Sequence, residues 1–218
     1  MRLKSLSVLL LGLMLSSTAV LAIAGKPGAM VPPDQVVHET ASQMFAAIEK
    51  HRADIKKDPE ELYKLVGNIL LPHFDFDYAS RLVLGRYWRT ATPQQRKEFE
   101  DAFYQYLVHQ YADGMLKGNY SDRSVKVEPW RGSDSDTRTF VRSKVMLGNN
   151  GSPVAVNYAM VKTKDGWKAY DVIIEGISYV MSYRTQFGTQ IEQQGIDAVI
   201  KKLKADAAKP KPANDKQG

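Results

Sequence analysis

The sequence predicts an α+β fold in which helices come first, an antiparallel sheet follows, and further helices end the chain. Apolar residues recur at three- and four-residue spacing from residue 34 to 117, which is typical of amphipathic helices. From residue 124 to 175 the spacing changes to two, with turn residues between the segments, and after Gly176 it becomes helical again. Because strands and helices do not alternate, we expect N-terminal helices packed on a curved antiparallel sheet of about four strands, followed by C-terminal helices. One α+β domain is predicted over residues 34–206.

The first half of the chain carries clear helix start and stop signals. Asp34 is a candidate N-cap for a helix of about five turns. Asp58-Pro59-Glu60-Glu61 opens a second helix, which we expect to end before Pro72. A short helix is predicted from about Asp75 to Leu84, with Gly85 as its stop.

The longest predicted helix opens with the capping box Thr92-Pro93-Gln94-Gln95 and reaches about Lys117. Apolar and aromatic side chains occupy two of its faces, so the helix is expected to be buried on several sides. One face holds Phe99, Ala102, Phe103, Tyr106 and Leu107, and the other holds Tyr104, Val108, Tyr111 and Met115.

Four strands are predicted over residues 124–130, 138–147, 153–163 and 167–175. Asn149-Asn150-Gly151-Ser152 and Lys164-Asp165-Gly166 supply the turns between the last three. The helices after Gly176 are expected to break near Gly188 and Gly195, and the last one carries Val199, Ile200 and Leu203.

The first 24 residues predict a secretory signal peptide, with a basic start, an apolar run from Leu6 to Leu15 and a small-x-small cleavage site at Ala22-Ile23-Ala24. A flexible leader is expected over residues 25–33 and a disordered tail over 207–218. The chain contains no Cys, which excludes a disulfide framework, thiol catalysis and a bacterial lipid anchor on the mature N-terminus. We therefore expect a periplasmic protein without a transmembrane span.

The charge is mildly basic, with a formal net charge of +6 that falls by two when Arg2 and Lys4 leave with the signal peptide. No dense basic stripe is present, so nucleic acid is not an expected partner. Four arginines flank Tyr87-Trp88, namely Arg81, Arg86, Arg89 and Arg96. Their side chains are expected to contact a lipid phosphate, an acidic partner surface or only solvent, and these alternatives stay open.

Groups that suggest catalysis or metal binding have simpler interpretations. His73-x-Asp75-x-Asp77 lies at a helix start, where capping is favoured over metal binding. Ser178 is not within a nucleophile elbow, and the scattered histidines lack ligand spacing. Asp171 and Glu175 lie four residues apart on a predicted strand face and are the one candidate carboxylate pair for an enzyme.

Two separated motifs resemble a known family. The first runs from Gly85-Arg-Tyr-Trp-Arg-Thr-Ala-Thr-Pro through Phe99 to Tyr111. The second is Gly166-Trp-Lys-Ala-Tyr-Asp-Val-Ile-Ile-Glu-Gly-Ile-Ser178, followed by Tyr183-Arg184-x-x-Phe187. Together, over residues 33–203, they resemble the periplasmic phospholipid-carrier family of the maintenance-of-lipid-asymmetry system (MlaC), also called the toluene-tolerance auxiliary family.

The resemblance implies a phospholipid shuttle between the two membranes, with no catalytic residues, cofactor or metal. It also implies two partners, which are a lipid-binding subunit of an inner-membrane ABC transporter and an outer-membrane lipoprotein–porin complex. The implied fold is similar to the nuclear transport factor cone, with acyl chains held between helices and sheet. A monomer is the simplest expectation.

Candidate lining residues for such a cavity come from the longest helix and from two strand faces. Which face lines it is open, because a one-residue slip inverts a strand. The alternatives are a small periplasmic enzyme on the same fold and an interaction module with a filled core. The candidates are Phe103, Tyr106, Leu107, Val154, Val156, Tyr158, Met160, Tyr170, Val172 and Ile174.

Overall fold

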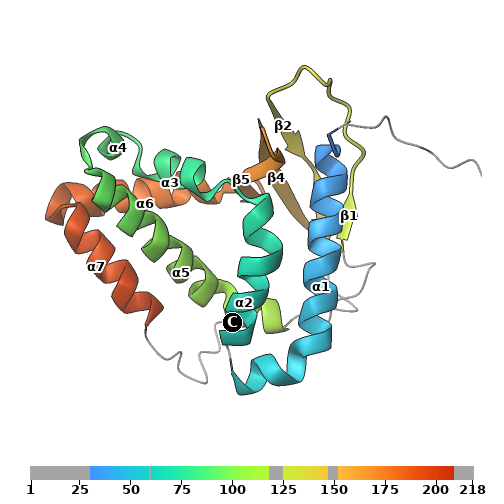
Figure 1. Ribbon diagram of the computed structural model, residues 1–218, viewed down its shortest axis with the longest axis horizontal. Coiled ribbons are helices and arrows are strands. Elements are labelled where there is room, and N and C mark those ends of the chain that lie inside the picture. The colour runs from blue at the N-terminus through green and yellow to red at the C-terminus, as the bar shows by residue number, and fades with distance from the viewer. Residues whose placement is uncertain (1–29, 59, 118–124, 147–151, 209–218) are drawn as a thin grey trace, which may run out of the picture.

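Helices at both ends of the chain pack around an open antiparallel sheet, which confirms the predicted α+β class (Figure 1). The computed structural model describes residues 30–58, 60–117, 125–146 and 152–208. The α-helices are α1 (Pro33–Lys57), α2 (Glu60–Leu65), α3 (Phe76–Leu84), α4 (Tyr87–Thr90), α5 (Pro93–Lys117), α6 (Tyr179–Gln194) and α7 (Ile196–Ala207). The strands are β1 (Val125–Val127), β2 (Arg138–Val141), β3 (Ser143–Val145), β4 (Val154–Thr163), β5 (Gly166–Ile174) and β6 (Ile177–Ser178).

The start of α1 differs from the prediction. Pro32 is the N-cap residue and Pro33 takes the first helical position, so Asp34 lies inside the first turn. Pro fits there because the first helical N–H needs no partner within the helix. The Asp34 carboxylate instead accepts a hydrogen bond of 3.0 Å from the Trp130 backbone N–H. Asp34 therefore links α1 to the segment after β1.

The second helix is α-helical only as far as Leu65. A wider π-helical turn (Val66–Leu70) and a 3-10 turn (Leu71–His73) follow it. Gly67 lies in the π turn, and a side chain there would meet the Tyr104 hydroxyl of α5 at 3.4 Å. The predicted stop before Pro72 marks the change to 3-10 geometry closely, but periodicity did not predict the π turn.

The predicted caps of the middle helices are confirmed. Asp75 accepts a hydrogen bond of 3.0 Å from the Tyr78 N–H at the start of α3. Gly85 ends α3 with a φ of 53°, in the region that favours glycine. Thr92 and Gln95 bond reciprocally before α5, at 3.1 and 3.0 Å. These caps fix where α3 and α5 enter the fold.

The sheet has the order β1-β3-β4-β5-β6, and β2 also pairs with β4. The strand predicted over 138–147 is divided at Arg142 into β2 and β3, and Leu147 lies outside the described residues. The strand predicted over 124–130 is shorter, since β1 covers only Val125–Val127. β4 and β5 match their predictions within a residue, and β6 was not predicted.

An irregularity in β5 changes which of its residues share a face. β4 pairs Ala159 with Asp171 and then Met160 with Ala169, so Tyr170 has no partner in the register. The pairing between β2 and β4 runs through the same part of β4 without interruption, so the irregularity lies in β5. Tyr170 is therefore the extra residue of a bulge, and Ala169 and Val172 lie on the same side of the sheet. This bulge was not visible in the alternation of the sequence.

The last two helices contain one confirmed and one wrong prediction. α6 continues through Gly188 without a break, and the space around that glycine is open to 4 Å. Gly195, with a φ of 82°, does separate α6 from α7. α7 includes Ala207, so the predicted tail starts one residue too early. The tail from residue 209, the predicted signal peptide and most of the predicted leader lie outside the described part of the chain.

Most of the buried apolar side chains in the described part of the chain form three clusters. The bundle cluster joins α3, α5, α6 and α7 around Phe99, Phe103, Tyr183 and Phe187. The α1–α2 cluster holds Met44, Ile48, Ile55, Leu62, Val66 and Val108. The sheet cluster holds Val36, Val37, Val141, Met160, Trp167 and Ala169. Helix α5 contributes to two of them, which confirms its predicted burial on more than one side.

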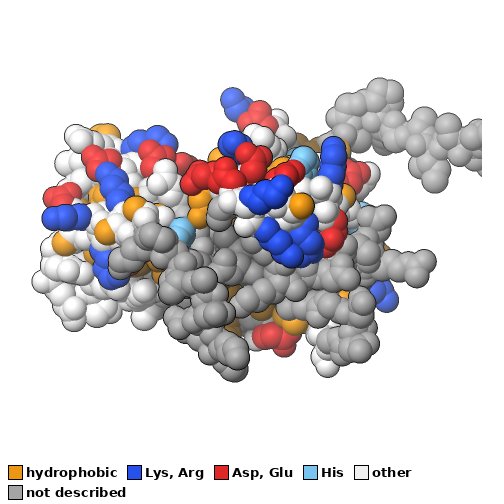
Figure 2. All heavy atoms as spheres, turned by 90° about the horizontal axis from the view of Figure 1, so that it is seen from below, with side chains coloured by type: hydrophobic (Ala, Val, Ile, Leu, Met, Phe, Trp, Pro, Cys, Tyr) orange, Lys and Arg blue, Asp and Glu red, His pale blue; other side chains and the backbone are white. Residues whose placement is uncertain are grey.

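Figure 1 shows the bundle on one side of the molecule and α1 with the sheet on the other, with α2 between them. Among the described residues, no helix has both the length and the apolar character needed to cross a membrane. On the face drawn in Figure 2, acidic and basic side chains are interspersed. Ion pairs of the described surface include Lys204 with Glu98 (2.7 Å) and Lys64 with Glu61 (2.7 Å).

Candidate functional site

One face of the sheet, which we call the inner strand face, carries the predicted strand candidates together. Val156 lies opposite Ile174 and Tyr158 lies opposite Val172 in the β4–β5 ladder. Directly opposed residues point to the same side, and alternation along β4 adds Val154 and Met160. At the Met160 end, α1 covers this face through Val36 and Val37. The register thus places six of the seven strand candidates on one surface.

The other end of the inner strand face is not fully covered. Val154, Val156, Val172 and Ile174 are all half-buried, and none belongs to any of the three buried clusters. A domain of this size ordinarily has one contiguous core that absorbs its apolar strand residues. Here four branched apolar side chains keep accessible surface on the side of the sheet that α1 faces. These four side chains are therefore the part of the inner strand face that lies outside the three clusters.

Tyr158 of the inner strand face packs against the sheet cluster. Its side chain keeps some accessible surface, but burial raises the pKa of its phenol to about 12, against a smaller opposite effect of a hydrogen bond with Ser143. Burial has this effect because it disfavours the charged phenolate. Tyr158 is therefore a largely buried residue at the edge of the sheet cluster.

The three helix candidates lie elsewhere. Phe103 is 3% exposed and packs its ring against Tyr183 at 5.1 Å, Phe187 at 5.5 Å and Phe76 at 5.6 Å. Tyr106 and Leu107 pack against the same bundle cluster. These residues fill a core among α3, α5 and α6, so the structure does not bring them together with the inner strand face.

A second side of α5 supplies groups that were not selected from the sequence. Tyr104 is half-buried, packs edge-on against Phe76 at 5.6 Å, and contacts the α1–α2 cluster together with Val108. Tyr111 is hydrogen-bonded to Tyr183 through their hydroxyls at 2.9 Å, and burial raises the pKa of Tyr111 to about 12. The sequence pattern did contain a signal for these residues, because the second apolar face of the predicted helix includes Tyr104, Val108 and Tyr111.

Tyr170 is the strand candidate that falls outside the group. As the bulge residue it does not follow Val172 and Ile174, and its ring packs against Tyr78 of α3 at 5.0 Å. Arg138 lies over the same Tyr78 ring at 5.7 Å. The predicted grouping of Tyr170 with Val172 and Ile174 is therefore wrong, because the bulge reverses the alternation between them.

The candidate carboxylate pair is not a pair in the structure. Asp171 is 7% exposed, and its carboxylate accepts hydrogen bonds from the Ser178 hydroxyl at 2.5 Å and the Val180 N–H at 3.0 Å. Glu175 lies beyond the end of β5 with a φ of 49°, and its carboxylate accepts from the Ala155 N–H at 2.5 Å. The prediction that both lie on one strand face is wrong, and each carboxylate holds backbone in place.

The other titratable motif also has a structural role. Asp75 caps α3, and its own N–H donates to the Ala169 carbonyl of β5 at 2.7 Å, which joins α3 to the sheet. Within the described residues, the structure contains no group of three or more His, Asp or Glu side chains arranged to hold a metal ion.

Comparison with known proteins agrees with this picture. A family model described as MlaC protein matches residues 38–205. The chain is 28% identical over 180 residues to the intermembrane phospholipid transport system binding protein MlaC of Haemophilus influenzae, covering 82% of this chain and 83% of that protein. It is 30% identical over 186 residues to toluene tolerance protein ttg2D of Pseudomonas putida, covering 84% and 85%.

A solved structure is also similar. The phospholipid-binding protein of Ralstonia solanacearum, determined in complex with a phospholipid, superposes with a TM-score of 0.70 and 30% sequence identity, covering 79% of this chain and 95% of that one. The family match spans the helices, the inner strand face and the last helix alike. On these matches, this chain belongs to the MlaC family.

Proposed function

We propose that this chain binds a phospholipid with its acyl chains along the inner strand face and carries it through the periplasm between the two membranes. Val154, Val156, Tyr158, Val172 and Ile174 form one wall of the site. The opposite wall comes from α1, α2 and the Tyr104–Val108 side of α5. The proposal assigns no catalytic step, cofactor or metal to this chain.

The physical need for a carrier is large. Each buried methylene stabilises by about 0.8 kcal/mol, so one sixteen-carbon chain resists entering water by roughly 12 kcal/mol. Diffusion of a free phospholipid across an aqueous compartment is therefore negligible. A protein interior that replaces the bilayer removes this barrier. If the lipid is only slightly more stable in the protein than in the bilayer, both loading and release remain possible.

The observation that carries the proposal is the state of Val156, Val172 and Ile174. They are apolar, paired on one face, half-buried, and outside every buried cluster. A filled core would absorb these side chains, and a solvated face would not be apolar. The phospholipid-binding protein of Ralstonia solanacearum, whose structure contains a phospholipid, supports the same interpretation.

We further propose that the protein is exported by its N-terminal segment and acts as a monomer. Its partners would be an inner-membrane transporter subunit and an outer-membrane complex that deliver and receive the lipid. Membership in a family named for intermembrane phospholipid transport supports these partners.

The test is to purify the protein from cells under gentle conditions, extract it with organic solvent, and identify the extract by mass spectrometry. We expect close to one phospholipid per protein. Val172→Trp fills the inner face and is expected to lower this ratio strongly, while Ile173→Trp, at the next position on the opposite face, is the matched control. A lipid-free wild-type protein would favour an interaction module with a filled core.

A further inference from the structure

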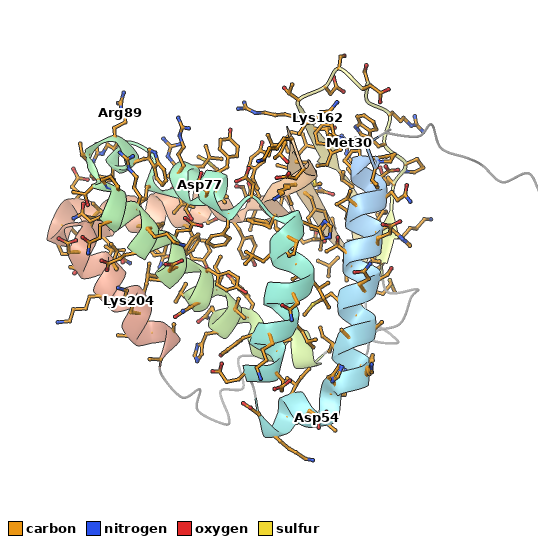
Figure 3. All side chains as sticks on the ribbon, in the orientation of Figure 1. Met30, Asp54, Asp77, Arg89, Lys162 and Lys204 are labelled. Carbon is orange, nitrogen blue, oxygen red and sulfur yellow. The ribbon has the colours of Figure 1, made fainter. Side chains whose placement is uncertain are left out.

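A pocket of about 370 Å³ lies where the end of α3, the short helix α4 and α6 meet. Its lining includes four arginines, Arg81, Arg86, Arg89 and Arg184, together with Leu82, Gly85 and Trp88. We call it the arginine pocket. Its residues come from the bundle side of the molecule, and none belongs to the inner strand face. Figure 3 shows the labelled Arg89 projecting outward from α4.

The positive charge of the arginine pocket is largely uncompensated. All four arginines are exposed. Arg86 has an acidic partner, with its guanidinium 3.3 Å from the Glu192 carboxylate. In the described part of the chain, Arg81, Arg89 and Arg184 have no carboxylate within 4.0 Å. Among the described residues, three guanidinium groups without a carboxylate partner therefore line one hollow.

The lining is held in place by specific contacts. An added side chain at Gly85 would lie 2.9 Å from Nε of Arg184, so the absent side chain lets the guanidinium lie against the backbone. Arg96 donates to the Trp88 carbonyl at 2.9 Å and lies over the Trp88 ring at 5.0 Å. These contacts fix the floor and one wall of the pocket before any ligand arrives.

We infer that the arginine pocket binds the phosphate of anionic phospholipid headgroups at a membrane surface, and so docks the carrier on the bilayer. Guanidinium groups bind phosphate oxygens in bidentate pairs, and several cations around one hollow match a phosphate better than a single carboxylate. The volume is sufficient for a headgroup. This inference rests on the proposed function, since partner complexes that lie in the two membranes bring the carrier close to a bilayer surface.

Apolar groups beside the arginines favour a bilayer over an acidic protein as the source of the phosphate. Trp88 and Leu82 line the pocket, and Met181, one turn before Arg184 on α6, is 53% exposed. Arginine next to tryptophan and exposed aliphatic side chains is the composition of surfaces that lie in the headgroup region.

The test measures co-flotation of the full-length mature protein with vesicles of phosphatidylcholine alone and with vesicles containing phosphatidylglycerol. We compare wild type with Arg81→Gln/Arg184→Gln and with the control Arg131→Gln/Arg142→Gln, which removes the same charge from exposed sites at the sheet end of the molecule. Each arginine near an anionic surface contributes about five-fold in affinity, so the pocket variant should lose roughly 25-fold on phosphatidylglycerol vesicles. The control should change by less than about three-fold.

Equal losses in both double variants would overturn the inference, since net charge alone would then explain binding. Binding of inorganic phosphate or of a polyglutamate peptide at the pocket without vesicle binding would also overturn it. The phospholipid content and thermal unfolding of each variant are measured in parallel. If the pocket variant loses vesicle binding but keeps its phospholipid content, the loss reports on the arginine pocket alone. If the wild-type protein carries no phospholipid, that result counts against the proposed function alone.

Discussion

Tyr158 of β4 lies directly opposite Val172 of β5, and both side chains are on the inner strand face. Tyr158 packs against the sheet cluster, and burial raises the pKa of its phenol to about 12, while Val172 is half-buried beside it. This pair marks where the sheet cluster ends along the inner strand face. The first two predictions concern this boundary.

A charge on the inner strand face should abolish lipid binding. Val156→Asp places a carboxylate among apolar side chains, where burial without a partner is costly, so lipid occupancy should fall by about tenfold or more. Val161→Asp is the matched control, because Val161 is half-buried on the other face of the same strand and lies opposite Arg138 and Lys168. Lipid content per protein by mass spectrometry checks both variants, and an equal loss in the control would contradict the assignment of the face.

Stability should decrease between pH 10 and pH 12 because of Tyr158. Its pKa is raised to about 12 in the folded protein, from an ordinary value near 10, so the unfolded chain releases this proton first. The stabilisation from the neutral phenol is thus present below pH 10 and is lost as pH rises through about 12, by on the order of 2 kcal/mol.

Because lysines titrate in the same range, the measurement compares wild type with Tyr158→Phe. Denaturant unfolding at several pH values should show a steeper loss of stability in wild type, and absorbance at 295 nm should report a late-titrating tyrosine that the variant lacks. Identical slopes in the two proteins would show that the Tyr158 phenol is not enclosed.

Asp171 should be a stability residue. Asp171→Ala removes the acceptor for the Ser178 hydroxyl and the Val180 N–H at the start of α6, and should lower the free energy of unfolding by about 2–3 kcal/mol. Glu175→Gln keeps an acceptor for the Ala155 N–H and should cost under about 1 kcal/mol. Urea unfolding distinguishes them, and a negligible effect at Asp171 would show that the cap is not important.

Two glycines near the C-terminus should respond in opposite ways to the same substitution. Gly188→Ala adds a side chain to the interior of α6 where nothing lies within 4 Å, and should stabilise by about 0.5–1 kcal/mol. Gly195→Ala must adopt a φ of 82° and should destabilise by about 1 kcal/mol or more. Thermal unfolding checks the pair, and destabilisation at Gly188 would mean that α6 does break there.

The sequence predicted the parts of the fold that depend on local chemistry. The caps at Asp75, Thr92 and Gly85 and the strands β4 and β5 follow from side-chain hydrogen bonds, glycine conformation and alternation, all of which act within a few residues. The uninterrupted path of α6 through Gly188 was not predictable in this way, because packing against neighbouring helices outweighs a weak local preference.

The candidate site was predicted only in part, for a related reason. Alternation correctly grouped Val156, Tyr158 and Met160, but the bulge at Tyr170 arises from pairing between strands and leaves no trace in β5 itself. Periodicity also marks Phe103 and Tyr104 as equally apolar, although Phe103 fills the bundle cluster and Tyr104 lies on the side of α1 and α2. An apolar position in a sequence does not reveal whether a neighbouring side chain or a ligand will cover it.

The central claim is that lipid, not protein, covers the inner strand face, and a crystal structure of the protein as purified from cells tests it most directly. We predict continuous electron density for hydrocarbon chains against Val156, Tyr158 and Val172. Side chains from α1, α2 and α5 packed against these three residues, with no room for hydrocarbon, would contradict the account.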